Sequence, residues 1–194
     1  MNIILGNKAS SADNQQERIE MCGWIAGFVD GEGSFLVNLF KSPRAKMGWQ
    51  IFPEFNVSQT LKGVDLLQKL KDFFNCGHIY IHRTRMKKEK KWDTLYKYCV
   101  RSREELKTKI IPFFRKYPPK SAAKKKDFEG FVKVIEMIEK KEHLTVKGMG
   151  KIANIILKEM THRKASKDLS AFKFLSSSET IRQAEHSKSS VRKR

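Results

Sequence analysis

Residues 24–34 read Trp-Ile-Ala-Gly-Phe-Val-Asp-Gly-Glu-Gly-Ser, and this stretch decides how the first part of the chain folds. Leading into it, apolar residues recur at steps of three and four positions, which predicts a helix over residues 16–30 with one buried face. Gly23, Gly27 and Gly31 recur every four positions, although a glycine inside a helix costs about 0.5–1 kcal/mol relative to alanine. We interpret these glycines as making close contact with another backbone, which would offset this cost.

Beyond Gly33 the apolar pattern changes to a period of two, which is typical of strands with one buried and one open face. Phe35, Val37 and Leu39 alternate with Leu36, Asn38 and Phe40, and residues 51–58 repeat the pattern after a hairpin loop over residues 41–49. A second pair of strands is expected over residues 78–83 and 94–101, joined by the basic loop 85–91.

Helical spacing returns between and after these strands. It predicts a helix over residues 61–74, ending at Asn75-Cys76-Gly77, and later helices over residues 102–115, 124–142 and 146–161. The order of helix, two strands, helix, two strands and further helices predicts an α+β fold with an antiparallel four-stranded sheet. The chain divides into a flexible leader over residues 1–15, one domain over residues 16–175, and a basic Ser- and Lys-rich tail over residues 176–194 with a short helix opening at Ser178.

The charge balance indicates an anionic partner. Among 194 residues, 40 Lys and Arg face 21 Asp and Glu, which gives a formal net charge of +19. Nucleic acid is the usual partner of so basic a globular chain, with an anionic membrane surface as the rival. No stretch of about 18 apolar residues predicts a membrane span. The scattered Cys22, Cys76 and Cys99 are interpreted as reduced thiols, and the amino terminus shows no export or import signal.

Residues 25–33, Ile-Ala-Gly-Phe-Val-Asp-Gly-Glu-Gly, resemble the LAGLIDADG motif of the homing endonucleases. Ile replaces the first Leu of the motif, Phe the second Leu, Gly the second Ala and Glu the last Asp. The resemblance runs from about residue 20 to about residue 182 and includes residues 53–59, 110–114, the basic run 120–126, and residues 178–182. It implies the αββαββα fold, in which two LAGLIDADG helices pack together and a curved sheet from each half lies in the DNA major groove. Only one copy of the motif is present, so the resemblance implies a homodimer.

The resemblance also implies the site residues. Glu32 is the catalytic metal ligand, with the carbonyl of Gly31 beside it. Two such carboxylates facing each other in a dimer repel unless cations lie between them, and oxygen donors favour Mg²⁺, although Mn²⁺ or Ca²⁺ is able to occupy the site. Gln59 is the polar residue that orders water, and Lys124 is the basic residue near the phosphate, with Lys120 or Lys126 as alternatives. Some members carry an arginine where this chain has Gly63.

Two surfaces are expected. A ridge on the motif helix forms the dimer interface through Gly23, Ala26, Gly27 and Asp30, and Asp30 is also expected to hold the helix end to nearby backbone rather than bind metal. Polar side chains on the open face of the strands are expected to read bases, and basic loop residues to hold phosphates. The DNA-binding candidates are Asn38, Phe40, Arg44, Lys46, Asn56, Ser58, His78, Tyr80, His82, Arg83, Arg85, Lys97 and Arg101.

Together these features predict a site-specific, metal-dependent homing endonuclease that cuts double-stranded DNA at a long, near-palindromic target. The alternative is a splicing maturase or DNA-binding regulator on the same fold, cleavage-deficient or bifunctional, and a maturase would add RNA as a partner. A chain that had lost cleavage would be expected to have lost its metal-binding acid, and the presence of Glu32 argues against that reading. The expected location is the organelle that encodes the gene, chloroplast or mitochondrion, or a microbial cytoplasm, with no membrane association.

Overall fold

The computed structural model describes residues 11–45, 48–85 and 92–161. Within these ranges the elements follow the predicted order. They are α1 Ser11–Glu32, β1 Gly33–Lys41, β2 Trp49–Gln59, α2 Val64–Phe74 after the short 3-10 turn Leu61–Gly63, β3 His78–Arg85, β4 Trp92–Val100, α3 Arg103–Glu105, α4 Ile111–Lys116, α5 Ala122–Glu139 and α6 Val146–Asn154. The α+β prediction is confirmed. The leader as far as residue 10, Lys46 and the tail 176–194 with Ser178 lie outside the described residues.

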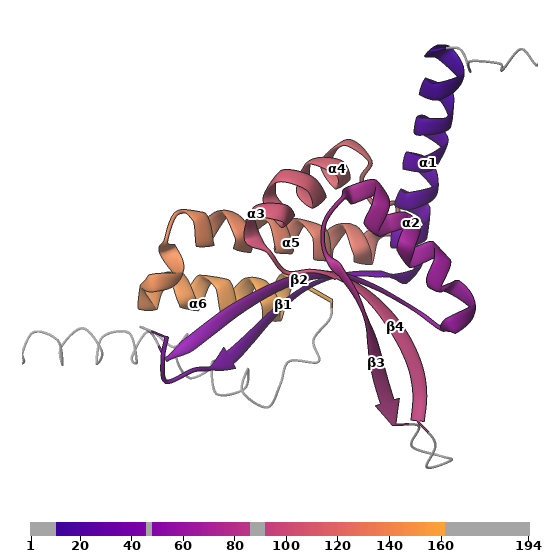
Figure 1. The fold of residues 1–194 in the computed structure, drawn as a ribbon. Helices are drawn as coiled ribbons and strands as arrows, with labels where there is room; N and C mark the ends of the chain where they lie inside the picture. Colours follow the sequence, from indigo (N-terminus) through magenta and orange to yellow (C-terminus); the bar gives the residue numbers. More distant parts are fainter. Residues whose placement is uncertain (1–10, 46–47, 86–91, 162–194) are drawn as a thin grey trace, which may run out of the picture.

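The four strands form one antiparallel sheet in the order β1-β2-β4-β3. β1 pairs with β2 from Gly33 opposite Val57 to Lys41 opposite Trp49, and β2 pairs with β4 from Phe55 opposite Val100 to Gln59 opposite Tyr96. Figure 1 shows helices α2 to α5 above the sheet, while the β1–β2 and β3–β4 hairpins spread apart below them. The sheet is therefore curved, with one face packed by helices and a concave face left open.

The helix-covered face holds a core rich in phenylalanine. Phe35 from β1 is fully buried, and its ring centroid lies 5.0 Å from that of Phe128, 5.1 Å from that of Phe114 and 5.6 Å from that of Phe131. One strand residue thus contacts rings from both α4 and α5. Because removing a buried aromatic side chain costs about 3–5 kcal/mol, this cluster fixes α5 against the start of β1.

Helix α1 begins at Ser11, so the prediction of a helix over residues 16–30 was wrong at its start. Residues 13–21 are exposed and carry no buried apolar face for a periodicity to detect. Local effects extend the helix instead, including the hydrogen bond from Gln16 Nε2 to Glu20 Oε1 at 3.0 Å. Only the carboxyl half packs on the sheet, through the buried Cys22, Ile25 and Val29.

The helix passes directly into β1 at Gly33. A Cβ atom at this position would lie 2.5 Å from Val29 Cγ1 and 2.8 Å from the Val29 carbonyl oxygen. No larger residue fits without moving the backbone, so glycine is required for the chain to turn this sharply from helix to strand. The turn holds residues 31 and 32 at the carboxyl end of α1, beside the edge of the sheet.

The later helices depart from their predicted bounds at the ends. α5 starts at Ala122 rather than Lys124, because the Ser121 side chain accepts a hydrogen bond from the Lys124 amide and caps the helix. It stops at Glu139, and Lys141 adopts a left-handed conformation with φ of 58°. Two π-helical turns are continuous with these helices: Leu106–Ile110 directly precedes α4, and Ile155–Glu159 directly follows α6.

In the part of the chain that the structure describes, no helix has the length and apolar character needed to cross a bilayer. The three predicted free thiols are buried and unpaired in disulfides. Burial raises the pKa of the Cys99 thiol to about 12, which keeps it protonated and unreactive at neutral pH.

Candidate active site

The carboxyl end of α1 presents a carboxylate to solvent. Glu32 is the last residue of the helix, and both it and Gly31 are exposed. The neighbouring turns are buried through Val29 and Gly33. The fold therefore anchors the helix on either side of an acid that it leaves open.

Asp30 ties this helix end to the start of α5. Its carboxylate accepts hydrogen bonds from the Lys120 amide at 3.0 Å, from the Ser121 amide at 2.9 Å and from the Ser121 hydroxyl at 2.7 Å. Burial alone would raise the pKa of Asp30, but the hydrogen bonds from Ser121 and Lys120 outweigh it and hold the pKa below its usual value. Within one chain Asp30 therefore performs the predicted anchoring, and its carboxylate is turned toward α5.

The same contact places Lys124. Ser121 caps α5, so Lys124 occupies the first turn, and its Nζ donates a hydrogen bond to the carbonyl oxygen of Gly33. The amine is half-buried, and desolvation lowers the pKa of Lys124 against the opposing pull of Asp127, Asp30 and Glu32. A lysine with a lowered pKa thus lies beside the Glu32 turn, and such perturbed groups are candidates for a chemical role.

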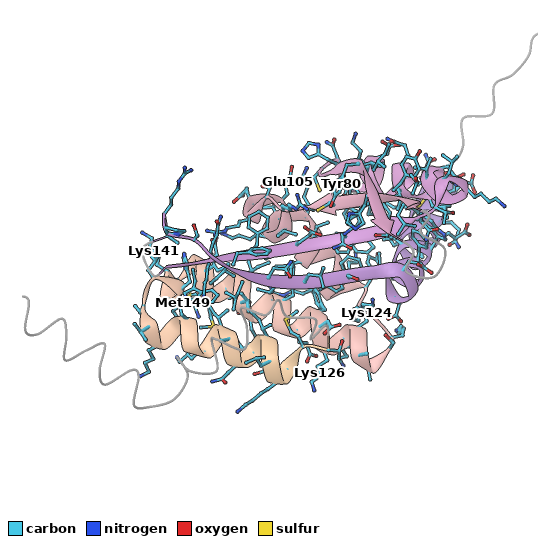
Figure 2. All side chains as sticks on the ribbon, turned by 90° about the horizontal axis from the view of Figure 1, so that it is seen from below. Tyr80, Glu105, Lys124, Lys126, Lys141 and Met149 are labelled. Atoms are coloured by element: carbon cyan, nitrogen blue, oxygen red, sulfur yellow. The ribbon has the colours of Figure 1, made fainter. Side chains whose placement is uncertain are left out.

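The two alternative lysines differ from Lys124. Lys120 and Lys126 are exposed, and Lys120 reaches Asp30 through its backbone amide and not its amine. Figure 2 shows Lys124 beside the strands and Lys126 on the outer side of α5. Of the three candidates, Lys124 is the residue that the structure brings to the end of α1.

Gln59 ends β2 at this same end of the sheet. Gly33 pairs with Val57, so Gln59 lies two residues further along β2, in the direction of Gly31 and Glu32. Its side chain packs on Gly63, where a Cβ atom would lie 2.7 Å from Gln59 Oε1. Gly63 thus makes room for the Gln59 carboxamide.

One copy of the described chain offers few metal ligands. Its residues contain no group of three His, Cys, Asp or Glu side chains that could hold a metal ion. The end of α1 supplies one carboxylate, from Glu32, and the adjacent carbonyl oxygen of Gly31. Both are hard oxygen donors of the kind that Mg²⁺ prefers.

The outer face of α1 is open and made of small residues. No described atom lies within 4 Å of a Cβ built on Gly23, Gly27 or Gly31. One turn earlier, Ile19 is 51% exposed. The predicted interface residues Gly23, Ala26 and Gly27 thus lie on a part of the helix surface that the described part of the chain leaves largely uncovered.

The concave face of the sheet carries most of the predicted DNA-binding side chains. The register confirms that they share one face, because Ser58 pairs with Lys97, Asn56 with Cys99, and Cys99 with His78. The members of this face are Asn38, Phe40, Asn56, Ser58, His78, Tyr80, His82, Lys97 and Arg101. Arg44 is exposed on the β1–β2 turn. The side chains of Arg83 and Arg85, like Lys46, lie outside the described residues.

Asn56 differs from its neighbours on this face. It is only 5% exposed, and its Nδ2 donates a hydrogen bond to Glu54 Oε1 at 2.7 Å. Glu54 in turn accepts a hydrogen bond from Arg101. Strand alternation placed Glu54 on the open face but gave no sign that it organises its neighbours, since its partner Arg101 is 47 positions away in the sequence.

Comparisons with known proteins agree with this geometry. The family model described as LAGLIDADG endonuclease matches residues 25–135. A Neurospora crassa protein named probable intron-encoded endonuclease 2 is 31% identical over 68% of this chain and 26% of its own length. DNA endonuclease I-CeuI of Chlamydomonas moewusii is 28% identical over 70% of this chain and 60% of its own length. The chain thus spans only part of these curated relatives.

Solved structures extend the agreement to three dimensions. The homing endonuclease I-TnaI is 34% identical, with a TM-score of 0.67 over 78% of this chain and 94% of that one. The I-LtrWI LAGLIDADG homing endonuclease, solved bound to target DNA, is 35% identical, with a TM-score of 0.68 over 79% of this chain and 49% of that one. From its motif helix, its sheet and these similarities, the chain belongs to the LAGLIDADG endonuclease family.

Proposed function

We propose that this protein is a site-specific endonuclease that makes double-strand breaks in DNA as a homodimer and uses divalent metal ions. The observation that carries the proposal is the exposed Glu32 at the end of α1, beside the half-buried Lys124 amine and next to an open, polar sheet face. An acid that could ligate metal, a base and a surface suited to a duplex thus meet at one end of the molecule. Relatives named as DNA endonucleases support the same reading.

The metal ligands in this proposal are Glu32 and the Gly31 carbonyl. When bound, Mg²⁺ would lower the pKa of a water and stabilise charge on the leaving oxygen in phosphodiester hydrolysis. Glu32 fits the role because it is exposed, has two oxygen donors, and lies outside the hydrogen bonds that occupy Asp30. Mn²⁺ and Ca²⁺ share the preference for oxygen donors and would occupy the same place.

Lys124 and Gln59 act in this proposal as the chain's own polar groups at the phosphate. The lowered pKa of Lys124 brings its amine closer to the range in which it gives and takes protons. Its positive charge also stabilises negative charge that grows on the phosphate. Gln59, held against Gly63, orients water through its carboxamide.

The homodimer follows from the need for a second carboxylate. Close packing of two copies through Gly23, Ala26 and Gly27 would bring the carboxyl ends of both α1 helices together. Two copies related by a two-fold axis recognise a target whose halves are related in the same way, so the proposed site is nearly palindromic. Each copy lays its concave sheet face along one half of the site.

Intron homing is the biological setting that we propose. The relatives in Neurospora crassa bear names as intron-encoded endonucleases, and homing requires a cut in an allele that lacks the intron. The protein would act in the compartment where its gene lies, an organelle or a microbial cytoplasm. A splicing role with RNA is the rival, and it does not require Glu32.

The experiment is a selection for cleaved sites. Purified protein is incubated with a randomised DNA library and Mg²⁺, and newly cut ends are sequenced. We expect one nearly palindromic consensus, cut on both strands, and no products when the metal is chelated. Specific binding to DNA or RNA without cutting in Mg²⁺, Mn²⁺ or other divalent ions would instead support the maturase or regulator.

A further inference from the structure

We propose that Glu54 and Arg101 form a base-reading unit on the concave face, in which buried Glu54 orients the Arg101 guanidinium toward the edge of a guanine in the major groove. The inference rests on the proposed DNA binding and names one base class that the surface recognises. Glu54 is a positioning residue in this unit, and Arg101 makes the base contact.

The two residues face each other because of the strand register. Phe55 on β2 pairs with Val100 on β4 in an antiparallel arrangement. Glu54 directly precedes Phe55, and Arg101 directly follows Val100. The next position along the two strands therefore places Glu54 and Arg101 opposite each other on the concave face. Arg101 Nε donates a hydrogen bond to Glu54 Oε2 at 2.6 Å.

Both oxygens of Glu54 have donors. Oε2 accepts from Arg101, and Oε1 accepts from Asn56 Nδ2 at 2.7 Å. The Glu54 side chain is 8% exposed, so it cannot approach a phosphate or a base itself. Glu54 instead forms an ion pair with the Arg101 guanidinium, and the hydrogen bond between them raises the pKa of Arg101.

Two aromatic rings hold the guanidinium from other sides. Arg101 Cζ lies 5.6 Å from the ring centroid of Tyr80 and 5.9 Å from that of Phe52. Arg101 Nη2 also donates a hydrogen bond to the Tyr80 hydroxyl at 3.1 Å. A flexible side chain is thus restrained by residues of β2 and β3 before DNA arrives, which lowers the entropy lost on binding.

The remaining donors of Arg101 suit a guanine. Nε is used by Glu54 and one Nη2 hydrogen by Tyr80, which leaves both Nη1 hydrogens and the second Nη2 hydrogen. The hydrogen bonds of Arg101 to other described residues use none of these, and its side chain is 49% exposed. A pair of parallel N–H donors on Nη1 and Nη2 matches the O6 and N7 acceptors that guanine presents in the major groove.

Stability alone does not account for this arrangement. Burying a carboxylate costs free energy that its ion pair only partly returns. On a DNA-facing surface an acid would also repel phosphates, unless a neighbouring cation neutralised its charge, as Arg101 does for Glu54. In Figure 2, Tyr80 lies well apart from Lys124, so the unit is separate from the candidate catalytic groups.

The test measures base preference by binding. The target consensus is first selected from randomised DNA by bound fraction in metal-free buffer, and then every single base substitution in a half-site is measured for wild type, Arg101→Lys and Glu54→Gln. Arg101→Lys keeps the charge but loses the planar fork. Glu104→Gln, at an exposed acid on α3, is the matched control for the lost charge.

We expect wild type to prefer guanine at one position of each half-site by roughly tenfold or more. Arg101→Lys should lose that preference at that position alone, Glu54→Gln should weaken it at the same position, and Glu104→Gln should leave it intact. Thermal melting of each variant separates this result from unfolding. Unchanged profiles in Arg101→Lys, or equal losses at every position, would overturn the unit. A wild type that reads this guanine but never cuts would instead contradict the endonuclease proposal and uphold the unit.

Discussion

The carboxylate of Asp30 accepts hydrogen bonds from both the amide and the hydroxyl of Ser121, a residue 91 positions later in the chain. Asp30 lies in the last turn of α1, and Ser121 is the N-cap of α5. The contact joins the helix that bears Glu32 to the helix that bears Lys124. This one contact thus sets the relative position of the two proposed catalytic groups.

Replacing Asp30 by Asn should weaken both stability and cleavage. The neutral amide is a poorer acceptor for the Ser121 and Lys120 amides, so we expect a loss of about 1–2 kcal/mol in the free energy of unfolding. Cleavage should fall further than DNA binding, because Lys124 shifts while the sheet stays in place. Urea unfolding and single-turnover cleavage measure the two effects. Asp72→Asn, at an exposed acid on α2, is the control, and equal losses in both variants would contradict this role of Asp30.

The Asp30 contribution should also depend on pH. The pKa of Asp30 is held below its usual value of 3.8, so the charged carboxylate favours the folded state. This stabilisation is complete above the unfolded-state pKa and is lost as the pH falls through the lower folded-state pKa. We expect wild type and Asp30→Asn to differ in melting temperature by a constant amount above about pH 5 and to converge as the pH falls below the ordinary pKa. A constant difference down to the lowest accessible pH would refute the assignment.

Lys124→Met should abolish most cleavage and leave the fold intact. The Lys124 amine is half-buried and its pKa is lowered by desolvation. At a pH below this lowered pKa, the charged amine destabilises the folded state, and this penalty disappears as the pH rises through the lowered pKa. Removing the charge should therefore cost little stability at neutral pH, while cleavage falls by roughly 100-fold or more. Lys125→Met, in the same turn but exposed, is the control. If Lys120→Met or Lys126→Met lost the activity and Lys124→Met kept it, the basic role would belong to those residues.

Gly27→Leu should block self-association without unfolding the chain. No described atom lies within 4 Å of a Cβ at Gly27, so a single copy accommodates the new side chain, and its helix gains about 0.5–1 kcal/mol from losing a glycine. A second helix packed against this face would meet that side chain. Light scattering should report a dimer for wild type and a monomer for Gly27→Leu. Gly150→Ala is the control, because Gly150 lies in α6 and a Cβ there also meets no described atom within 4 Å. This variant should remain dimeric, and a dimeric Gly27→Leu would contradict the proposed interface.

Gly63→Ala should impair cleavage through Gln59. The added Cβ would lie 2.7 Å from Gln59 Oε1, and the flexible end of that side chain must move away. We expect a lower cleavage rate with nearly unchanged melting temperature, and a similar rate for Gln59→Ala. If Gln59→Ala cleaved at the wild-type rate, Gln59 would be only a solvated strand end.

The sequence predicted the fold well where periodicity reflects burial. Residues 25–33 and the alternation through Phe35 and Phe55 marked the helix end, the strands and the core side of the sheet, because these positions are buried at regular intervals. The same patterns predicted the start of α1 poorly, since residues 13–21 are exposed and give no buried periodicity.

The candidate site was predictable only in part. The motif placed Glu32, and strand alternation placed Arg101 and Asn56 on the concave face. Strand alternation did not indicate that Glu54 is buried and bonded to both Arg101 and Asn56, because the β2–β4 register brings together residues 47 positions apart. Likewise, a run of lysines offers no local signal to separate Lys124 from Lys120 and Lys126. That distinction comes from Ser121, which fixes where α5 begins.

The most direct test of the proposed chemistry is single-turnover cleavage of the selected target by Glu32→Gln with Mg²⁺, alongside DNA binding by the same variant and Glu129→Gln as an exposed control. We predict that Glu32→Gln binds the target with close to wild-type affinity and forms dimers, while its cleavage rate falls by at least about 100-fold. Cleavage by Glu32→Gln at the wild-type rate would contradict a catalytic metal held at the end of α1.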